Sequence, residues 1–140
     1  MSCCIAVNCV DGRAQRPAIE YLRTRFGVPH VDVVSEWNPA HVLAGSHVSE
    51  QTRSVVERVN LLLAAHDVVA VALVAHQGCE EAGQFDADPI EELSMAVQHL
   101  AQHVTEHRVI GLWIDQMGAV QEIRAKEGDE SHCRRQSSLS

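Results

Sequence analysis

VVAVALVA, residues 68–75, is a continuous run of apolar side chains, and His76 follows it directly. A strand that is apolar at every position is typical of a parallel sheet that is buried on both faces. Such a sheet needs helices on both sides, because an uncovered face would expose the apolar side chains to water. The run therefore predicts a central strand of an α/β fold.

Segments on either side of this run alternate between strand and helix patterns. Further strands are predicted at residues 4–8, 31–35, 109–114 and 119–124, and helices at 16–26, from about 49 to 63, and 89–107. Ser49 or Ser46 is a candidate cap for the second helix, Gly27 ends the first, and residues 38–45 fit either a loop or a short helix. The alternation predicts a mostly parallel sheet in the order 2-1-3-4, with an antiparallel edge strand and helices on both faces.

The composition is that of one globular domain. The chain has 140 residues, of which 46% are hydrophobic and 21% charged, and we expect a single domain over residues 1–125. Residues 126–140 are polar, so we expect them to form a disordered tail. The net charge of −8 argues against nucleic acid or an anionic membrane surface as a partner. No apolar run approaches the ~20 residues that a membrane span needs.

Five cysteines are present, in a sequence that shows no signal peptide pattern. This usage predicts reduced thiols or metal ligands in a reducing, cytoplasmic compartment. Cys3 and Cys4 lie inside an apolar run, so we expect both to be buried as small hydrophobic side chains.

Two short motifs follow two of the predicted strands. Cys9-x-Asp11-x-Arg13 comes after the first strand, and His76-x-x-Cys79 comes after the central one. In the predicted strand order these strands are neighbours at the point where the winding reverses, and ligands bind there, beyond the carboxyl ends of the strands. We therefore expect the two motifs to form one site.

The residue types of this site point to zinc. Two cysteine thiolates and one imidazole, from Cys9, Cys79 and His76, suit Zn²⁺, and three protein ligands leave a fourth position open for chemistry. A zinc-bound water there becomes hydroxide near neutral pH, which can attack an electrophilic carbon such as that of carbon dioxide. Asp11 is placed to accept a hydrogen bond from that water or to occupy the fourth position, and Arg13 to hold Asp11 ionised. The alternative is a buried Cys9, with Asp11 as a helix cap in a surface ion pair with Arg13.

With these motifs the chain resembles the β-class carbonic anhydrases, and most of all the short members of that superfamily. The segment GLWID at residues 111–115 is also similar to the family, and the likeness covers about residues 3–124. The resemblance implies Cys9, His76 and Cys79 as zinc ligands, and Asp11 with Arg13 as the catalytic pair at the fourth position. It also implies reversible hydration of carbon dioxide to bicarbonate, in a homodimer or higher homo-oligomer.

Two alternatives to this activity stay open. One is hydrolysis of a related small substrate, carbonyl sulfide or carbon disulfide, and the other is a non-catalytic zinc-binding interaction protein. Both are motivated by departures from the family: Glu80 and Glu81 follow Cys79 where a glycine is common, and SEWNPAH at residues 35–41 replaces a segment rich in Arg, Asn and Gly.

Histidines outside the motifs have two alternative interpretations. His41 and His47 are candidates for proton shuttles or for solvated loop residues. His99, His103 and His107 recur every four residues, and we expect them to share one exposed or interface face of a helix.

Overall fold

The predicted sheet order is confirmed by a computed structural model, which describes residues 2–45, 47–79, 88–104 and 106–125. Five strands lie in the order β2-β1-β3-β4-β5. β1, β2, β3 and β4 are parallel, and β5 pairs with β4 in the antiparallel direction. The strands are β1 (Ser2–Cys9), β2 (Val31–Glu36), β3 (Asp67–His76), β4 (Val109–Ile114) and β5 (Val120–Ile123).

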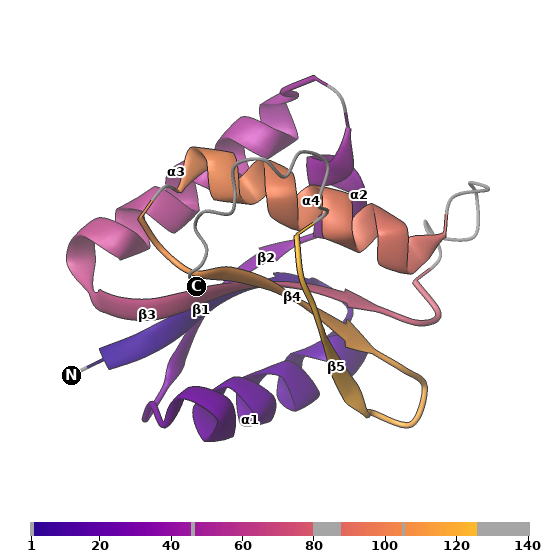
Figure 1. Cartoon of the computed structure of the whole chain (residues 1–140), viewed down its shortest axis with the longest axis horizontal. Helices are drawn as coiled ribbons and strands as arrows, with labels where there is room; N and C mark the ends of the chain where they lie inside the picture. Colours follow the sequence, from indigo (N-terminus) through magenta and orange to yellow (C-terminus); the bar gives the residue numbers. More distant parts are fainter. Residues whose placement is uncertain (1, 46, 80–87, 105, 126–140) are drawn as a thin grey trace.

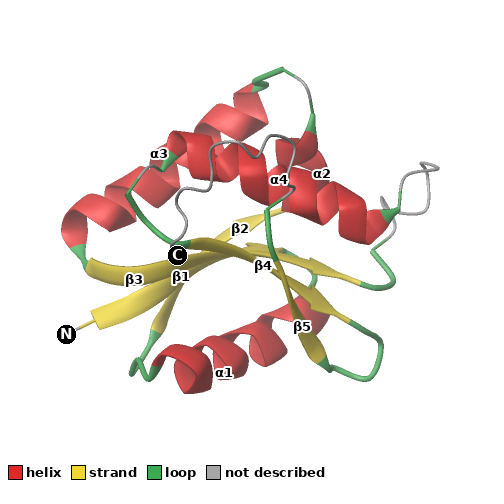
Figure 2. Cartoon of the chain, viewed as in Figure 1, coloured by secondary structure: helices red, strands yellow, loops and turns green. Residues whose placement is uncertain are grey.

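Helices cover both faces of the sheet, as Figure 1 shows. One face carries α1 (Gln15–Phe26), which a short 3-10 helix, η1 (Gly12–Ala14), connects to β1. The other face carries α2 (Pro39–Ala44), α3 (Glu50–Ala65) and α4 (Pro89–His103). In Figure 2 the yellow sheet is the middle of three layers, between α1 and the three other helices.

Two apolar cores result, one on each face of the sheet. On β1, Cys4 and Ala6 belong to the core beneath α1, whereas Ile5 and Val7 belong to the core beneath the other helices. This alternation follows from the two-residue period of a strand. Because both faces are covered, β3 is buried at five successive positions, from Ala70 to Val74, as the apolar run predicted.

Most predicted helix ends agree with the structure. Gly27 takes the left-handed conformation, with φ 63°, and ends α1, while the hydroxyl of Ser49 accepts a hydrogen bond from the backbone of Thr52 and caps α3. The undecided stretch 38–45 contains the short helix α2. Cys3 and Cys4 are fully buried, as expected.

The prediction for α4 was wrong at its end, because α4 stops at His103 rather than at His107. Val104 leaves the helical conformation, with φ −125° and ψ 57°, and its side chain is buried in the core beneath α2, α3 and α4. The chain then turns toward β4. His107 consequently does not share a helix face with His99 and His103.

No helix among the described residues is long and apolar enough to cross a membrane. The predicted polar tail, residues 126–140, lies outside the described residues, as do Glu80, Glu81, and the other residues up to 87.

Close packing of α4 on β4 provides a test of the fold. A Cβ atom on Gly111 would lie 3.0 Å from Cγ2 of Val97 and 3.1 Å from Cγ of Leu93. We expect Gly111→Ala to lower the free energy of unfolding by about 1–3 kcal/mol, because α4 and β4 must move apart to make room for the added methyl group. Urea unfolding measures this. Gly45→Ala is the control, since its Cβ would have no neighbour nearer than 3.7 Å; equal midpoints for the two variants would contradict this packing.

Candidate metal centre

The two sequence motifs meet at one edge of the sheet. Cys9 is the last residue of β1, His76 is the last residue of β3, and Cys79 lies just beyond. The sulfur atoms of the two cysteines and a ring nitrogen of His76 all lie within 4.8 Å of one another. All three residues are buried, with exposed fractions of 1%, 4% and 8% for Cys9, His76 and Cys79. Parallel pairing of β1 with β3 brings them together.

The imidazole of His76 is oriented for a ligand. Its Nδ1 lies 3.1 Å from the carbonyl oxygen of Gln77, and a carbonyl only accepts hydrogen bonds, so Nδ1 carries the proton. The other ring nitrogen, Nε2, is therefore the bare acceptor of the neutral ring. Nε2 is buried and has no hydrogen-bond partner. A buried acceptor without a partner is costly unless a ligand takes its lone pair.

The donor set fits zinc. Bonds of about 2.3 Å to sulfur and 2.0–2.1 Å to nitrogen place the ligand atoms of a tetrahedral zinc ion about 3.5–3.8 Å apart. The separations in this cluster, all under 4.8 Å, need only small side-chain rotations to reach those values. Zinc sites commonly use cysteine thiolates and a histidine whose other ring nitrogen donates a hydrogen bond to a carbonyl or a carboxylate, as Nδ1 of His76 does here. That Cys9, His76 and Cys79 bind a metal stays a prediction.

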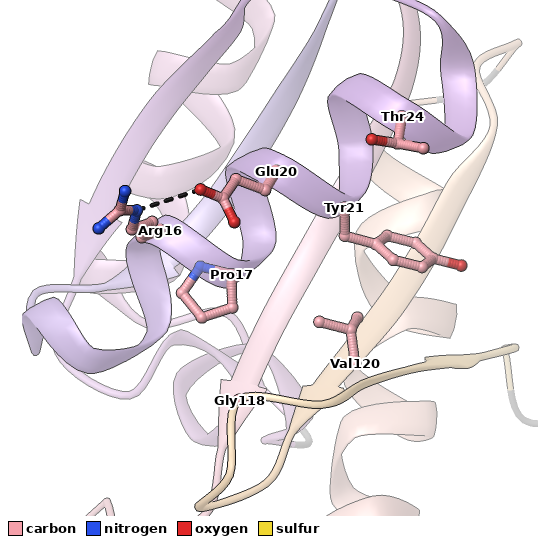
Figure 3. Close-up of a pocket in the computed structure, with 7 residues that line it drawn as sticks. All are labelled: Arg16, Pro17, Glu20, Tyr21, Thr24, Gly118 and Val120. Atoms are coloured by element: carbon pink, nitrogen blue, oxygen red, sulfur yellow. Dashed lines mark hydrogen bonds and ion pairs between the residues drawn. The ribbon is translucent and has the colours of Figure 1, made fainter.

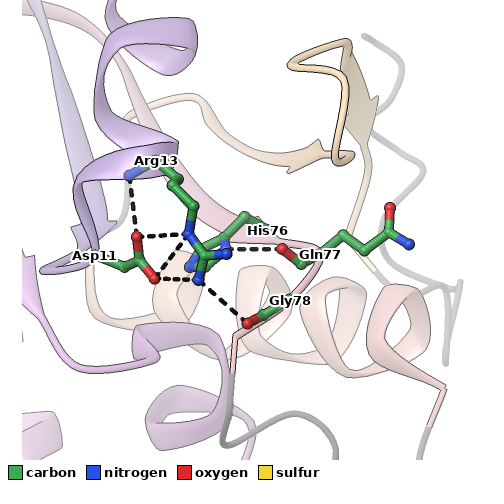
Figure 4. A network of polar contacts seen from close by, with 5 residues as sticks. All are labelled: Asp11, Arg13, His76, Gln77 and Gly78. Atoms are coloured by element: carbon green, nitrogen blue, oxygen red, sulfur yellow. Dashed lines mark hydrogen bonds and ion pairs between the residues drawn. The ribbon is translucent and has the colours of Figure 1, made fainter.

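Asp11 and Arg13 form a tight ion pair, which Figure 4 shows together with His76 and Gly78. Oδ2 of Asp11 accepts from Nη2 of Arg13 at 2.5 Å, and Oδ1 accepts from Nε and from the backbone N of Arg13, each at 3.0 Å. These hydrogen bonds hold the pKa of the Asp11 carboxyl well below its usual range. Asp11 is thus a carboxylate throughout the neutral and mildly acidic range.

Electrostatics link this pair to the cluster. Hydrogen bonding to Asp11 raises the pKa of Arg13 most, and the charges of Cys79 and Cys9 raise it further. Asp11 is not a member of the group of close ligand atoms, and its two oxygens are engaged by Arg13. The fourth side of the cluster is therefore not filled by Asp11 in this structure.

The alternative without a metal, in which Cys9 is simply buried and Asp11 caps a helix, accounts for part of the same geometry. Cys9 is buried, Asp11 caps η1 through the backbone N of Arg13, and the two side chains form an ion pair. A purely structural role nevertheless does not explain why Cys79 and His76, whose Nε2 has no hydrogen-bond partner, both lie beside Cys9.

Gly78 lets the two motifs approach each other. Its φ of +88° belongs to the left-handed region, which only glycine adopts at little cost. A Cβ on Gly78 would lie 3.4 Å from Nη1 of Arg13, and the carbonyl oxygen of Gly78 accepts from Nη2 at 3.3 Å. The Arg13 guanidinium therefore lies directly on the loop that joins His76 to Cys79.

Two asparagines that belong to neither motif lie at the carboxyl ends of β1 and β2. Asn8 is fully buried; its Oδ1 accepts from the backbone N of Cys9 at 2.9 Å and its Nδ2 donates to the carbonyl of Ala14 at 3.5 Å. Asn38, beyond the end of β2, has a buried Nδ2 without a hydrogen-bond partner. Polar residues at the ends of apolar strands were the available signal for both.

The other candidate histidines do not belong to this group of close ligand atoms. Nδ1 of His41 is 2.8 Å from the Glu92 carboxylate, which joins α2 to α4, and His47 is exposed. His47 lines a hollow of about 120 Å³ with His99 and His103. A second hollow, of about 460 Å³, lies between α1 and the turn before β5, and Figure 3 shows its lining residues. Neither hollow is lined by a residue of the two motifs.

Comparison with known proteins places the chain in a family. The model of the family described as "Putative carbonic anhydrase" matches residues 1–124, and the chain belongs to this family. None of the curated proteins matches the sequence.

Solved structures of β-carbonic anhydrases are similar to this chain. β-Carbonic anhydrase isoform I from Trichomonas vaginalis is 16% identical, with a TM-score of 0.56 over 86% of this chain and 81% of that one. The β-carbonic anhydrase CafA of Aspergillus fumigatus is 19% identical, with a TM-score of 0.49 over 88% and 76%. A structure of tetrameric β-carbonic anhydrases from Sordaria macrospora is 17% identical, with a TM-score of 0.43 over 84% and 78%. The likeness to the Trichomonas vaginalis structure confirms the α/β fold that the sequence predicts.

The role of Asn8 is testable by truncation. We expect Asn8→Ala to lower the free energy of unfolding by about 1–3 kcal/mol, because the backbone N–H of Cys9 and the Ala14 carbonyl lose their buried partner. Thermal unfolding of the metal-free chain measures this without any contribution from metal. Asn60→Ala, the same exchange on the exposed surface of α3, is the control. A loss no larger than that of the control would mean that Asn8 does not hold this loop.

Proposed function

We propose that this protein is a zinc-dependent carbonic anhydrase, which catalyses the reversible hydration of carbon dioxide to bicarbonate. Cys9, His76 and Cys79 hold the metal in this proposal. The observation that carries it is the side chain of His76 at the reversal point of the sheet: its Nε2 is buried and has no partner, and a nitrogen of its ring lies within 4.8 Å of two cysteine sulfur atoms. Membership of the carbonic anhydrase family supports the same activity.

The bound metal would act as a Lewis acid that makes a water molecule nucleophilic near neutral pH. The chain's own residues then position that water. Asp11 is kept ionised by Arg13, so its carboxylate accepts a hydrogen bond from a water molecule on the open side of the cluster and orients it. Because Nη2 of Arg13 is also bound to the Gly78 carbonyl, the guanidinium fixes the direction of Asp11 against the loop that carries Cys79.

Arg13 has a second role in this proposal. Its side chain is 66% exposed, so part of the guanidinium faces solvent beside the cluster. A fixed positive charge at that place attracts bicarbonate, the anionic substrate of the reverse reaction. Salt screens exposed charges, so we expect this effect mainly at low ionic strength.

Assembly and compartment stay predictions. We expect a homodimer or higher homo-oligomer, because β2 is an open edge of the sheet and apolar side chains are exposed on or beside it, at Val10, Val33 and Trp37. A reducing, cytoplasmic compartment is expected from the cysteine usage.

A neutral variant of Asp11 tests the catalytic part of the proposal. We expect Asp11→Asn to lower the rate of carbon dioxide hydration by at least about a hundredfold, because an amide does not accept the water proton as a carboxylate does. Stopped-flow hydration at mildly alkaline pH, on protein of known zinc content, measures this rate. Glu57→Gln on the exposed surface of α3 is the matched control.

The other outcomes of this measurement separate the alternatives. Zinc-loaded wild-type protein without turnover of carbon dioxide would overturn the proposed activity. Turnover of carbonyl sulfide or carbon disulfide by the same sample would then indicate the related hydrolysis. Inactivity toward all three substrates would favour a non-catalytic zinc-binding role.

Removal of one proposed ligand tests the metal centre itself. We expect Cys79→Ser to contain one equivalent of zinc less than the wild type and to unfold at lower temperature, because metal bound only to the folded state stabilises it. Metal analysis after gel filtration gives the stoichiometry. Cys4→Ala is the control, because Cys4 is buried beneath α1 away from the cluster. Unchanged zinc in Cys79→Ser would rule out this ligand set.

A further inference from the structure

A second group of ligand-type side chains lies at the opposite end of the sheet. The sulfur of Cys3, a ring nitrogen of His30 and a carboxylate oxygen of Asp32 all lie within 4.8 Å of one another. Cys3 is buried, Asp32 is half-buried and His30 is exposed. None of these residues belongs to the two motifs. In Figure 1, β1 and β3 both begin at the left of the view and run to the right, so this group lies on the left and the two motifs lie on the right.

Topology explains why these residues converge. Cys3 is near the start of β1, and Asp32 is near the start of the neighbouring β2, whose parallel register pairs Ile5 with Asp32. Cys3 shares its strand face with Ile5, and Asp32 shares its face with Val34; both of these apolar residues lie in the core beneath α3. Cys3 and Asp32 therefore face the same layer, the one that contains α3.

The separation of two of these groups is close to that of ligands on one metal ion. Sγ of Cys3 lies 3.7 Å from Oδ2 of Asp32. Bonds of about 2.3 Å to sulfur and 2.0 Å to oxygen place the two donors about 3.5 Å apart around a tetrahedral zinc ion. An imidazole nitrogen from His30 completes a mixed sulfur, nitrogen and oxygen set, which suits Zn²⁺ or Co²⁺ better than the hard cations Mg²⁺ and Ca²⁺.

His66 supports this group from α3. It is the residue that caps the end of α3, and its Nδ1 lies 2.7 Å from Oδ2 of Asp32. Its ring also stands edge-on to the ring of His30, with centroids 6.4 Å apart. His66 is therefore placed to hold the Asp32 carboxylate in one orientation. Outer hydrogen bonds of this kind orient the ligands of metal sites.

Local charge also favours a cation. Burial raises the pKa of the Cys3 thiol most, and the charges of Asp32 and Asp67 raise it further. We identify no arginine or lysine among the described residues in contact with Cys3, His30 or Asp32 through a hydrogen bond or ion pair. A divalent ion would neutralise this negative charge and would join β1, β2 and the end of α3.

We propose that Cys3, His30 and Asp32 bind a second divalent transition-metal ion, with His66 as the positioning residue for Asp32. Binding replaces the Cys3 thiol proton, which passes to solvent, by a bond from the sulfur to the metal. The ion has no part in the proposed carbon dioxide chemistry, because it lies at the amino ends of the strands. Its role is to hold β1, β2 and α3 together, which raises the stability of the folded chain.

A zinc count on the full chain tests this proposal. Metal-free protein is saturated with Zn²⁺, passed through a gel-filtration column, and analysed for zinc per chain by plasma mass spectrometry. We expect His30→Ala and Cys3→Ala each to contain one equivalent less than the wild type. His47→Ala, which removes another exposed histidine, should contain the same amount as the wild type. His30 is exposed, so its variant should fold even where Cys3→Ala does not.

A second measurement separates the ligands from the positioning residue. We expect His66→Ala to keep the wild-type stoichiometry but to bind the second equivalent about 10- to 100-fold more weakly. With Co²⁺ as the probe, Cys3→Ala should lose part of the thiolate-to-cobalt absorption, whereas His66→Ala should keep it at saturation.

Equal zinc counts in the wild type, His30→Ala and Cys3→Ala would overturn the proposal, whatever that count is. The result is independent of the metal centre at the other end of the sheet. If Cys79→Ser retained all of its zinc while His30→Ala lost one equivalent, the proposed catalytic centre would fail and the second site would stand.

Discussion

Parallel pairing between β1 and β3 is the constraint on which the rest of this structure depends. The two strands are far apart in the sequence, yet their register places Cys9 and His76 at one edge of the sheet, at the point where the winding reverses. Burial on both faces stabilises this pairing, because α1 covers one side of β1 and β3 and the other helices cover the opposite side. Without that pairing the first motif would be an isolated cysteine beside an ion pair, and the second an isolated histidine and cysteine.

Hydrogen bonds to the backbone hold the side chains of the site in defined orientations. Asn8 fixes the turn after β1, and the Gln77 carbonyl selects the tautomer of His76. Arg13 connects the two loops, because the same guanidinium binds Asp11 and the Gly78 carbonyl. Each of these contacts acts on the orientation of a donor atom, and orientation decides whether three side chains act as one metal centre.

The two ends of the sheet have different chemistry. The carboxyl ends of β1 and β3 bring together two thiols, an imidazole and an Asp–Arg pair. The amino ends of β1 and β2 bring together a thiol, a carboxylate and imidazoles from His30 and His66. Both groups use side chains at or beside strand ends, where the backbone leaves the hydrogen-bonded ladder of the sheet. The first group is buried and has an unpartnered acceptor, whereas the second is partly exposed and hydrogen-bonded within itself.

The sequence by itself determined the strand order, the layers and the residues of the first cluster, because apolar periodicity and strand-end motifs are local signals. It also indicated the caps at Gly27 and Ser49, which depend on single residues. Only the tertiary structure decided where α4 ends, because the burial of Val104 in the core overrides the helical spacing of the histidines. The same holds for the support by Asn8, the bare Nε2 of His76 and the convergence of Cys3 with Asp32. Each of these depends on contacts or register between segments distant in the sequence, which no local pattern encodes.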